Sequence, residues 1–131
     1  MAITLHFVNA LAFATSDLSK TFAMTEILAQ VFDVLESAYD RDFATEDVNT
    51  ARFITHLRYF FARAASGQQL SEQPHAFNTS VRDSFPEAAQ AAQKVRAVLE
   101  LRLGTTLTED EATYLILHIA RLTGNLRKDP R

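Results

Sequence analysis

Glycine and proline, the residues that most strongly interrupt regular secondary structure, are rare in this chain and lie between segments of helical periodicity. Only three glycines and three prolines occur in 131 residues. Between them, apolar residues recur at intervals of three and four, and no segment shows the strict apolar–polar alternation of a half-buried strand. The pattern therefore predicts an all-α fold, a bundle of five or six helices.

Six segments carry this periodicity, and the residues at their ends are typical of helix boundaries. The expected helices cover approximately residues 2–13, 21–39, 46–66, 75–85, 86–104 and 109–124. Gly67 and Gly124 lie where a glycine commonly ends a helix, and Pro86 suits a first helical turn, where its missing N–H is not needed. Thr108 and Glu111 have the spacing of a capping box, which opens the last helix.

The composition indicates one globular domain over residues 1–131 and argues against several classes of protein. Hydrophobic residues make up 47% and charged residues 22%, which is typical of a folded domain. The net charge of −3 argues against nucleic-acid binding by this chain alone, because such modules present a strongly basic face. There is no cysteine, so disulfides and thiolate metal sites are excluded.

The two ends of the sequence contain no targeting or membrane signal. The opening "MAITLHFVNALAFA" is apolar, but it lacks a basic start and is too short to span a bilayer. We therefore expect a cytoplasmic protein without a membrane segment. The polar, basic tail from about residue 125 is expected to fray.

A histidine lies in the middle of the apolar segment "ITHLRYFFAR", residues 54–63. A helix turns by about 100° per residue, which places His56 just outside the arc formed by the neighbouring aromatic and leucine side chains. Arg63, seven residues later, returns to nearly the same line, and Arg52, four residues earlier, lies on that side too. His56 is therefore expected at a polar–apolar border beside two guanidinium groups.

The last predicted helix repeats this arrangement in "YLILHIAR", residues 114–121. His118 lies at the margin of the apolar face, with Tyr114 one turn before it and Arg121 three residues after it. Glu111 precedes the histidine by two turns. Both histidines are thus expected to be partly exposed, each with an arginine within possible reach.

Such a histidine can accept a phosphoryl group. Near its ordinary pKa of about 6.5 it is largely neutral and nucleophilic at cytoplasmic pH. An adjacent arginine would hold the phosphoryl oxygens by charge-assisted hydrogen bonds. From spacing alone, however, a histidine on a helix is more often structural. We expect no metal site or cofactor, because no HxxxH or HExxH pair occurs. His6 is expected to be structural and His75 to be merely exposed.

Two separate segments give the sequence a specific resemblance. "ARFITHLRYFFARAASG" and "LTEDEATYLILHIARL" resemble the two histidine segments of a PTS regulation domain (PRD), and "TLHFVNA" resembles the start of one. PRDs are regulatory modules of BglG/LicT-type transcriptional antiterminators and of some related activators. The resemblance extends over essentially the whole chain, and the segment around His56 looks more like the second module of the usual tandem pair than the first.

The resemblance implies an all-helical, non-enzymatic regulatory domain that forms homodimers. Its histidines would be phosphorylated by the phosphoenolpyruvate-dependent sugar phosphotransferase system, through the phosphocarrier HPr or a sugar-specific permease component. His56 and His118 would be the phosphoacceptors, and phosphorylation would shift the dimer arrangement. Arg63 and Arg121 would support the phosphoryl groups, with Arg52 a further candidate.

Antitermination would require RNA contact through an N-terminal domain that this sequence lacks. One alternative is the same kind of module serving a DNA-binding activator. Another, from a different class, is a small helical enzyme that uses His56 and His118 as acid and base. The enzyme would need a closed pocket that holds both histidines and a small ligand.

Overall fold

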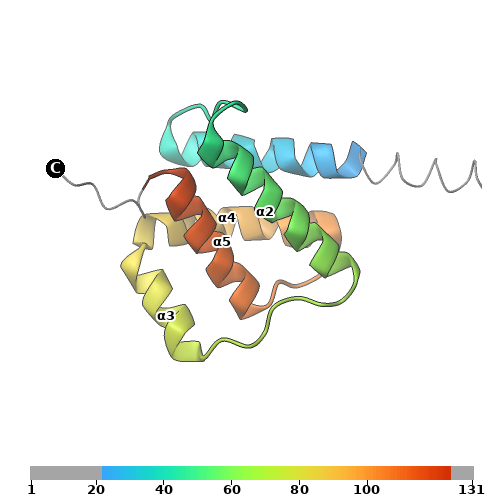
Figure 1. Cartoon of the computed structure of the whole chain (residues 1–131), viewed down its shortest axis with the longest axis vertical. Helices are drawn as coiled ribbons and strands as arrows, with labels where there is room; N and C mark the ends of the chain where they lie inside the picture. Colours follow the sequence, from blue (N-terminus) through green and yellow to red (C-terminus); the bar gives the residue numbers. More distant parts are fainter. Residues whose placement is uncertain (1–21, 125–131) are drawn as a thin grey trace, which may run out of the picture.

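The computed structural model describes residues 22–124, and every regular element among them is a helix (Figure 1). There are five: a helical segment over residues 22–39, α2 (Val48–Ala65), α3 (His75–Ser84), α4 (Pro86–Leu103) and α5 (Glu109–Leu122). The predicted all-α fold is confirmed, and these five helices begin and end close to the expected residues. The helix predicted over residues 2–13 lies outside the described part.

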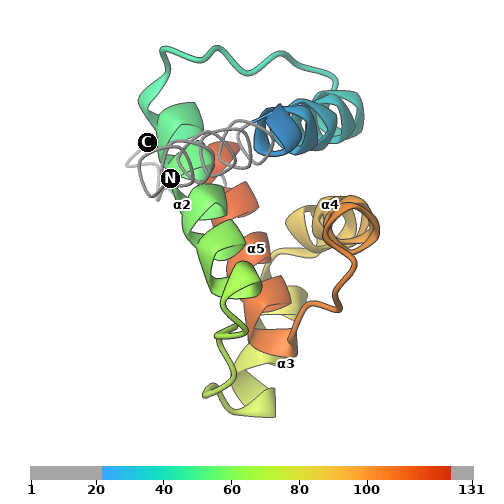
Figure 2. The same cartoon turned by 90° about the vertical axis from the view of Figure 1, so that its right-hand side faces the viewer.

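Helix α5 occupies the middle of the bundle and contacts α2, α3 and α4 (Figures 1 and 2). A helix surrounded on several sides must be apolar over most of its circumference. The buried apolar residues of α5 are accordingly Leu115, Ile116, Ile119, Ala120 and Leu122. The same helix also buries three polar residues, Asp110, Glu111 and Thr113, and half-buries His118.

Helix α2 turns an aromatic face toward this core. Phe53 is 2% exposed, and its ring meets Phe32 of the helical segment 22–39 edge to face, with the ring centroids 5.7 Å apart. Leu57, Phe60 and Phe61 are buried along the same helix. This face fixes the rotation of α2 about its axis, so His56 lies at the border that the sequence predicts.

The predicted helix boundaries are formed by local hydrogen bonds. Gly67 follows α2 with a φ of +71°, and the next residue, Gln68, donates its N–H to the carbonyl of Arg63 at 2.8 Å. This is the Schellman arrangement, which favours glycine because its left-handed conformation strains other residues. Pro86 begins α4, as expected, and Thr108 is the N-cap of α5.

Candidate functional site

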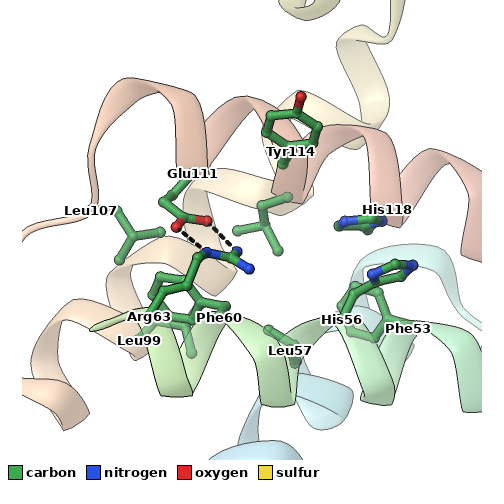
Figure 3. Close-up of a pocket in the computed structure, with 11 residues that line it drawn as sticks. Phe53, His56, Leu57, Phe60, Arg63, Leu99, Leu107, Glu111, Tyr114 and His118 are labelled. Carbon is green, nitrogen blue, oxygen red and sulfur yellow. Dashed lines mark hydrogen bonds and ion pairs between the residues drawn. The ribbon is translucent and has the colours of Figure 1, made fainter. Parts of the chain in front are cut away.

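The two histidines singled out from the sequence stack against each other. His56 of α2 and His118 of α5 have ring centroids 4.0 Å apart and ring planes inclined by 15° (Figure 3). Both residues are half-buried. The sequence placed each histidine at the edge of its own helix, but it gave no sign that the two edges face each other. The two histidines, predicted separately on two helices, therefore lie side by side in one place.

Burial and positive charge both favour the neutral form of these imidazoles. Burial lowers the pKa of His118 to about 4, assisted by His56, Arg121 and Arg63. Burial also lowers the pKa of His56, with further lowering from Arg121, Arg52 and Arg63. At neutral pH the two rings stack without charge repulsion, and each neutral ring keeps a nitrogen lone pair.

Arg63 is held by a buried carboxylate. Its Nε donates to Oε2 of Glu111 and its Nη2 donates to Oε1, both at 2.7 Å. The Glu111 side chain is 2% exposed and that of Arg63 is 31% exposed. Hydrogen bonding to Glu111 raises the pKa of the guanidinium, which stays charged. Figure 3 shows Arg63 between Glu111 and the histidine pair.

Arg52 and Arg121 differ from Arg63. Both are exposed, and neither forms an ion pair with another residue of the described range 22–124. Their charges nevertheless act on the histidine pair, since both lower the pKa of His56. The three arginines selected from the sequence therefore surround the pair electrostatically. Arg63 is bound by a carboxylate through two of its three nitrogens, and the other two arginines have no ion-pair partner within residues 22–124.

Little empty space lies beside the histidines. The hollow that both rings line, together with Arg63, Glu111 and Tyr114, has a volume of about 20 Å³. That volume holds about one water molecule and no metabolite. Any group larger than a water molecule would have to approach the pair from the surface. The closed, ligand-sized pocket that an enzyme using both histidines would need is not present at this pair.

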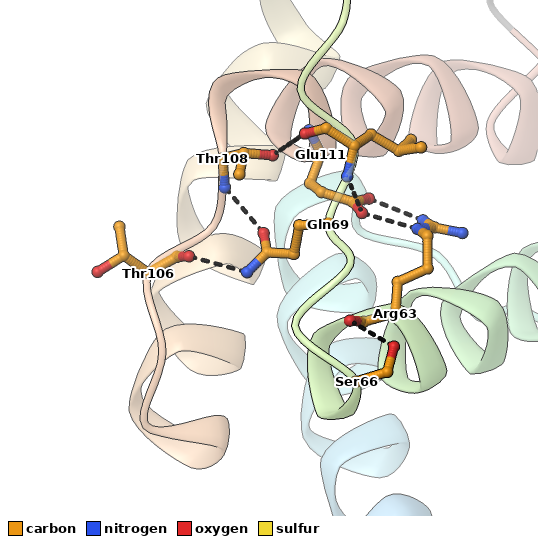
Figure 4. Close-up of polar contacts among 7 residues, drawn as sticks. Arg63, Ser66, Gln69, Thr106, Thr108 and Glu111 are labelled. Carbon is orange, nitrogen blue, oxygen red and sulfur yellow. Dashed lines mark hydrogen bonds and ion pairs between the residues drawn. The ribbon is translucent and has the colours of Figure 1, made fainter.

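The first turn of α5 also anchors the connection between α2 and α3 (Figure 4). Besides binding Arg63, Oε2 of Glu111 accepts the N–H of Leu70 at 3.0 Å. Thr108 donates its hydroxyl to the carbonyl of Leu70, and its own N–H is bound by Oε1 of Gln69 at 2.9 Å. Only half of the predicted capping box forms: Thr108 accepts the N–H of Glu111, but the Glu111 carboxylate binds Arg63 and Leu70 instead.

Asp110 and Glu109, the two acidic residues before Glu111, also bind the connection and the start of α3. Asp110 is buried and accepts the N–H of Gln73 at 2.7 Å and the side-chain amide of Asn78 at 3.1 Å. These hydrogen bonds, the first of them most strongly, lower the pKa of Asp110. His75 is exposed, as expected, and its Nδ1 lies 2.8 Å from a carboxylate oxygen of Glu109.

Within residues 22–124, no helix is long and apolar enough to cross a bilayer. Nor do three or more metal-binding side chains converge anywhere in that range.

Comparison with known proteins gives one family and a set of relatives. The family model described as "PRD domain" matches residues 21–122. The chain is 26% identical over 120 residues to the transcription antiterminator LicT of Bacillus subtilis, covering 92% of this chain and 43% of that protein. It is 24% identical to the beta-glucoside operon antiterminator of Dickeya chrysanthemi, covering 96% of this chain and 44% of the relative.

A third relative, the PtsGHI operon antiterminator of Bacillus subtilis, is 28% identical over 95% of this chain and 43% of its own length. The chain thus spans less than half the length of these curated relatives. No solved structure gives a significant match.

Proposed function

This chain belongs to the PRD domain family, and we propose that it is a regulatory domain controlled by reversible phosphorylation of His56 and His118. The observation that carries the proposal is the stacking of these two histidines at 4.0 Å, at a half-buried border with arginines around it. Both rings are neutral at neutral pH, because burial lowers the pKa of each, and both remain partly exposed, which is what a phosphoacceptor requires.

The chemistry is phosphoryl transfer between imidazoles. The lone pair of a neutral ring nitrogen attacks the phosphorus of a donor phosphohistidine. A new N–P bond forms as the donor's N–P bond breaks, and its electron pair returns to the donor ring. The acceptor ring releases its remaining N–H proton to solvent and the departing donor ring takes one up, so protons balance. The arginines attract the donor and hold the phosphoryl oxygens.

The new charge would change the border where the histidines stack. A phosphoryl group on one histidine adds a charge of about −1.5 to −2. The ring of the other histidine lies beside it, since the two ring centroids are 4.0 Å apart. Arg52 and Arg121, both exposed, are free to turn toward it. The stacked arrangement of two neutral rings therefore gives way to a charged one, in which arginines neutralise the phosphate.

Helix α2 presents a surface that such a change could control. Val48 is 66% exposed and Tyr59 is 61% exposed. At about 100° per residue, both lie on the same side of α2 as Arg52 and His56. Large apolar side chains exposed beside a phosphoacceptor suit a protein interface. We propose that the domain forms a homodimer and that phosphorylation shifts the arrangement of its subunits at or near this face.

The relatives suggest the process that the domain serves. All three are named as antiterminators, and this chain matches less than half of each. We propose that it regulates a sugar-responsive antiterminator in the cytoplasm, where a separate domain would contact RNA. These names favour antitermination over service to a DNA-binding activator. The donors would be HPr or a sugar-specific permease component, and HPr in particular if this is a second module.

Phosphorylation and assembly can be tested together. The chain is incubated with phosphoenolpyruvate, Enzyme I and HPr, and separately with a phosphorylated sugar-permease component. Intact-mass spectrometry counts the phosphoryl groups, and light scattering with small-angle X-ray scattering follows the subunit arrangement. We expect acid-labile phosphate from one donor and a changed dimer profile. Absence of phosphate with both donors would contradict the proposal, and phosphate without any change in the dimer would remove its regulatory part.

A further inference from the structure

Glu111 shares helix α5 with His118, and its ion-pair partner Arg63 shares helix α2 with His56. It precedes His118 by seven residues on α5, and Arg63 follows His56 by seven residues on α2. The contacts of His56 with His118 and of Arg63 with Glu111 show that the two helices run antiparallel in this register. The backbones of the ion-paired residues therefore lie about two turns, roughly 10 Å, along the two helices from those of the histidines, and the Arg63 side chain lines the same hollow as the two rings.

The hydrogen bonds of Glu111 fix the orientation of the Arg63 guanidinium. Nε and Nη2 are both bound by the carboxylate, a bidentate geometry that sets the plane of the group. The remaining nitrogen, Nη1, donates to no residue in the described part of the chain. In Figure 3 the guanidinium lies between the carboxylate and the histidines, with its unbonded nitrogen on the histidine side.

We propose that Glu111 is a positioning residue for phosphoryl transfer: it fixes Arg63 so that its unbonded N–H groups face a phosphoryl group arriving at the histidine pair. The inference rests on the phosphoacceptor function proposed above. Without the carboxylate, a long side chain that is 31% exposed would be free to sample many rotamers. Glu111 then acts on the reaction only through Arg63 and does not touch the phosphoryl group.

A purely structural role for Glu111 must be separated from this one, because its carboxylate also accepts the N–H of Leu70. The chain offers a matched control. Oε2 of Glu100 on α4 accepts Nε of Arg96 at 3.1 Å and the N–H of Leu107 at 2.8 Å. Glu100 thus makes the same kinds of contact, an arginine on a helix and a backbone N–H of a connection, but does not line the histidine hollow.

The experiment measures the initial rate of phosphoryl transfer from phosphorylated HPr, or from the permease component if that is the active donor, to the full chain. The variants are Glu111→Gln, Arg63→Gln, the double variant of both, and Glu100→Gln. We expect Glu111→Gln and Arg63→Gln each to lower the saturating rate about tenfold or more, since misplacing a group that binds the reacting phosphoryl is costly. The donor concentration at half-saturation should change little, and Glu100→Gln should leave both quantities unchanged.

The double variant decides between the two roles. If Glu111 works through Arg63, Glu111→Gln should slow transfer no further once Arg63 is already Gln. A Glu111→Gln rate equal to that of the wild type, or an additional slowing in the Arg63→Gln background, would overturn the proposal. Circular dichroism checks that each variant folds. If Glu111→Gln does not fold, Arg63→Lys takes its place, because lysine keeps the charge without the bidentate geometry. Arg63→Lys must then slow transfer. An unphosphorylated wild type would contradict the proposed function instead.

Discussion

The low pKa of His118 predicts that the domain loses stability under mildly acidic conditions. In the folded chain burial holds this pKa at about 4, with assistance from His56, Arg121 and Arg63, whereas an unfolded histidine titrates near 6.5. Between these values the unfolded state binds more protons than the folded state. The stability contributed by the neutral ring is therefore fully present above about pH 6.5 and is lost as the pH falls toward 4.

The magnitude follows from the difference between the two pKa values. A full shift of this size corresponds to about 3 kcal/mol, because each pKa unit is worth about 1.4 kcal/mol. The His118 ring is only partly buried, so solvent screening reduces the expected loss to about 1–2 kcal/mol between about pH 7.5 and about pH 5. The pKa of His56 is also lowered, which adds a contribution of the same sign. Carboxylates with lowered pKa values, such as Asp110, titrate below this interval.

Urea unfolding followed by far-ultraviolet circular dichroism measures the effect at both pH values. The wild type is compared with His118→Gln, which cannot titrate at that position, and with His75→Gln, which removes an exposed histidine. We expect the loss on acidification to shrink in His118→Gln and to persist in His75→Gln. Equal losses in all three proteins, or a His118 pKa near 6.5 by nuclear magnetic resonance, would refute the reasoning.

Three further predictions concern other parts of the same structure. Phosphorylating His56 should raise the pKa of His118, because an anion beside a ring favours its protonated form; a resonance titration unchanged by phosphorylation would contradict this. Phe53→Ala should lower the free energy of unfolding by about 3–5 kcal/mol, since the ring is 2% exposed; a loss under about 1 kcal/mol in chemical denaturation would show that the core differs from the one described. Gly67→Ala should cost about 1–2 kcal/mol in the same assay through its left-handed backbone alone, because no atom lies within 4 Å of an added Cβ; an unchanged stability would argue against the Schellman turn.

The helices and their ends could be predicted because their signals are local. Gly67, Pro86 and Thr108 each act on backbone groups within a few residues, so their chemistry is readable along the sequence. The border positions of His56 and His118 follow from helical periodicity in the same way. The family resemblance is confirmed by the match over residues 21–122.

The contacts that make the site could not be predicted, because they join residues far apart in the chain. The stacking of the two histidines depends on the register of α2 against α5, which no local pattern encodes. Glu111 shows how a tertiary contact changes a local prediction. The capping-box spacing predicts that the Glu111 carboxylate accepts the N–H of Thr108. In the structure both carboxylate oxygens instead bind Arg63, and the side chain of Gln69 accepts the Thr108 N–H.

The assignment of His56 and His118 as the phosphoacceptors is tested most directly by counting acid-labile phosphoryl groups on matched variants. His56→Gln, His118→Gln and their double variant are phosphorylated beside the wild type, with a double variant of the two remaining histidines, His6 and His75, as the control. We predict that phosphate falls in each single variant, is absent from the double variant, and is unchanged in the control. A His56→Gln/His118→Gln double variant that still carries the wild-type amount would contradict the account.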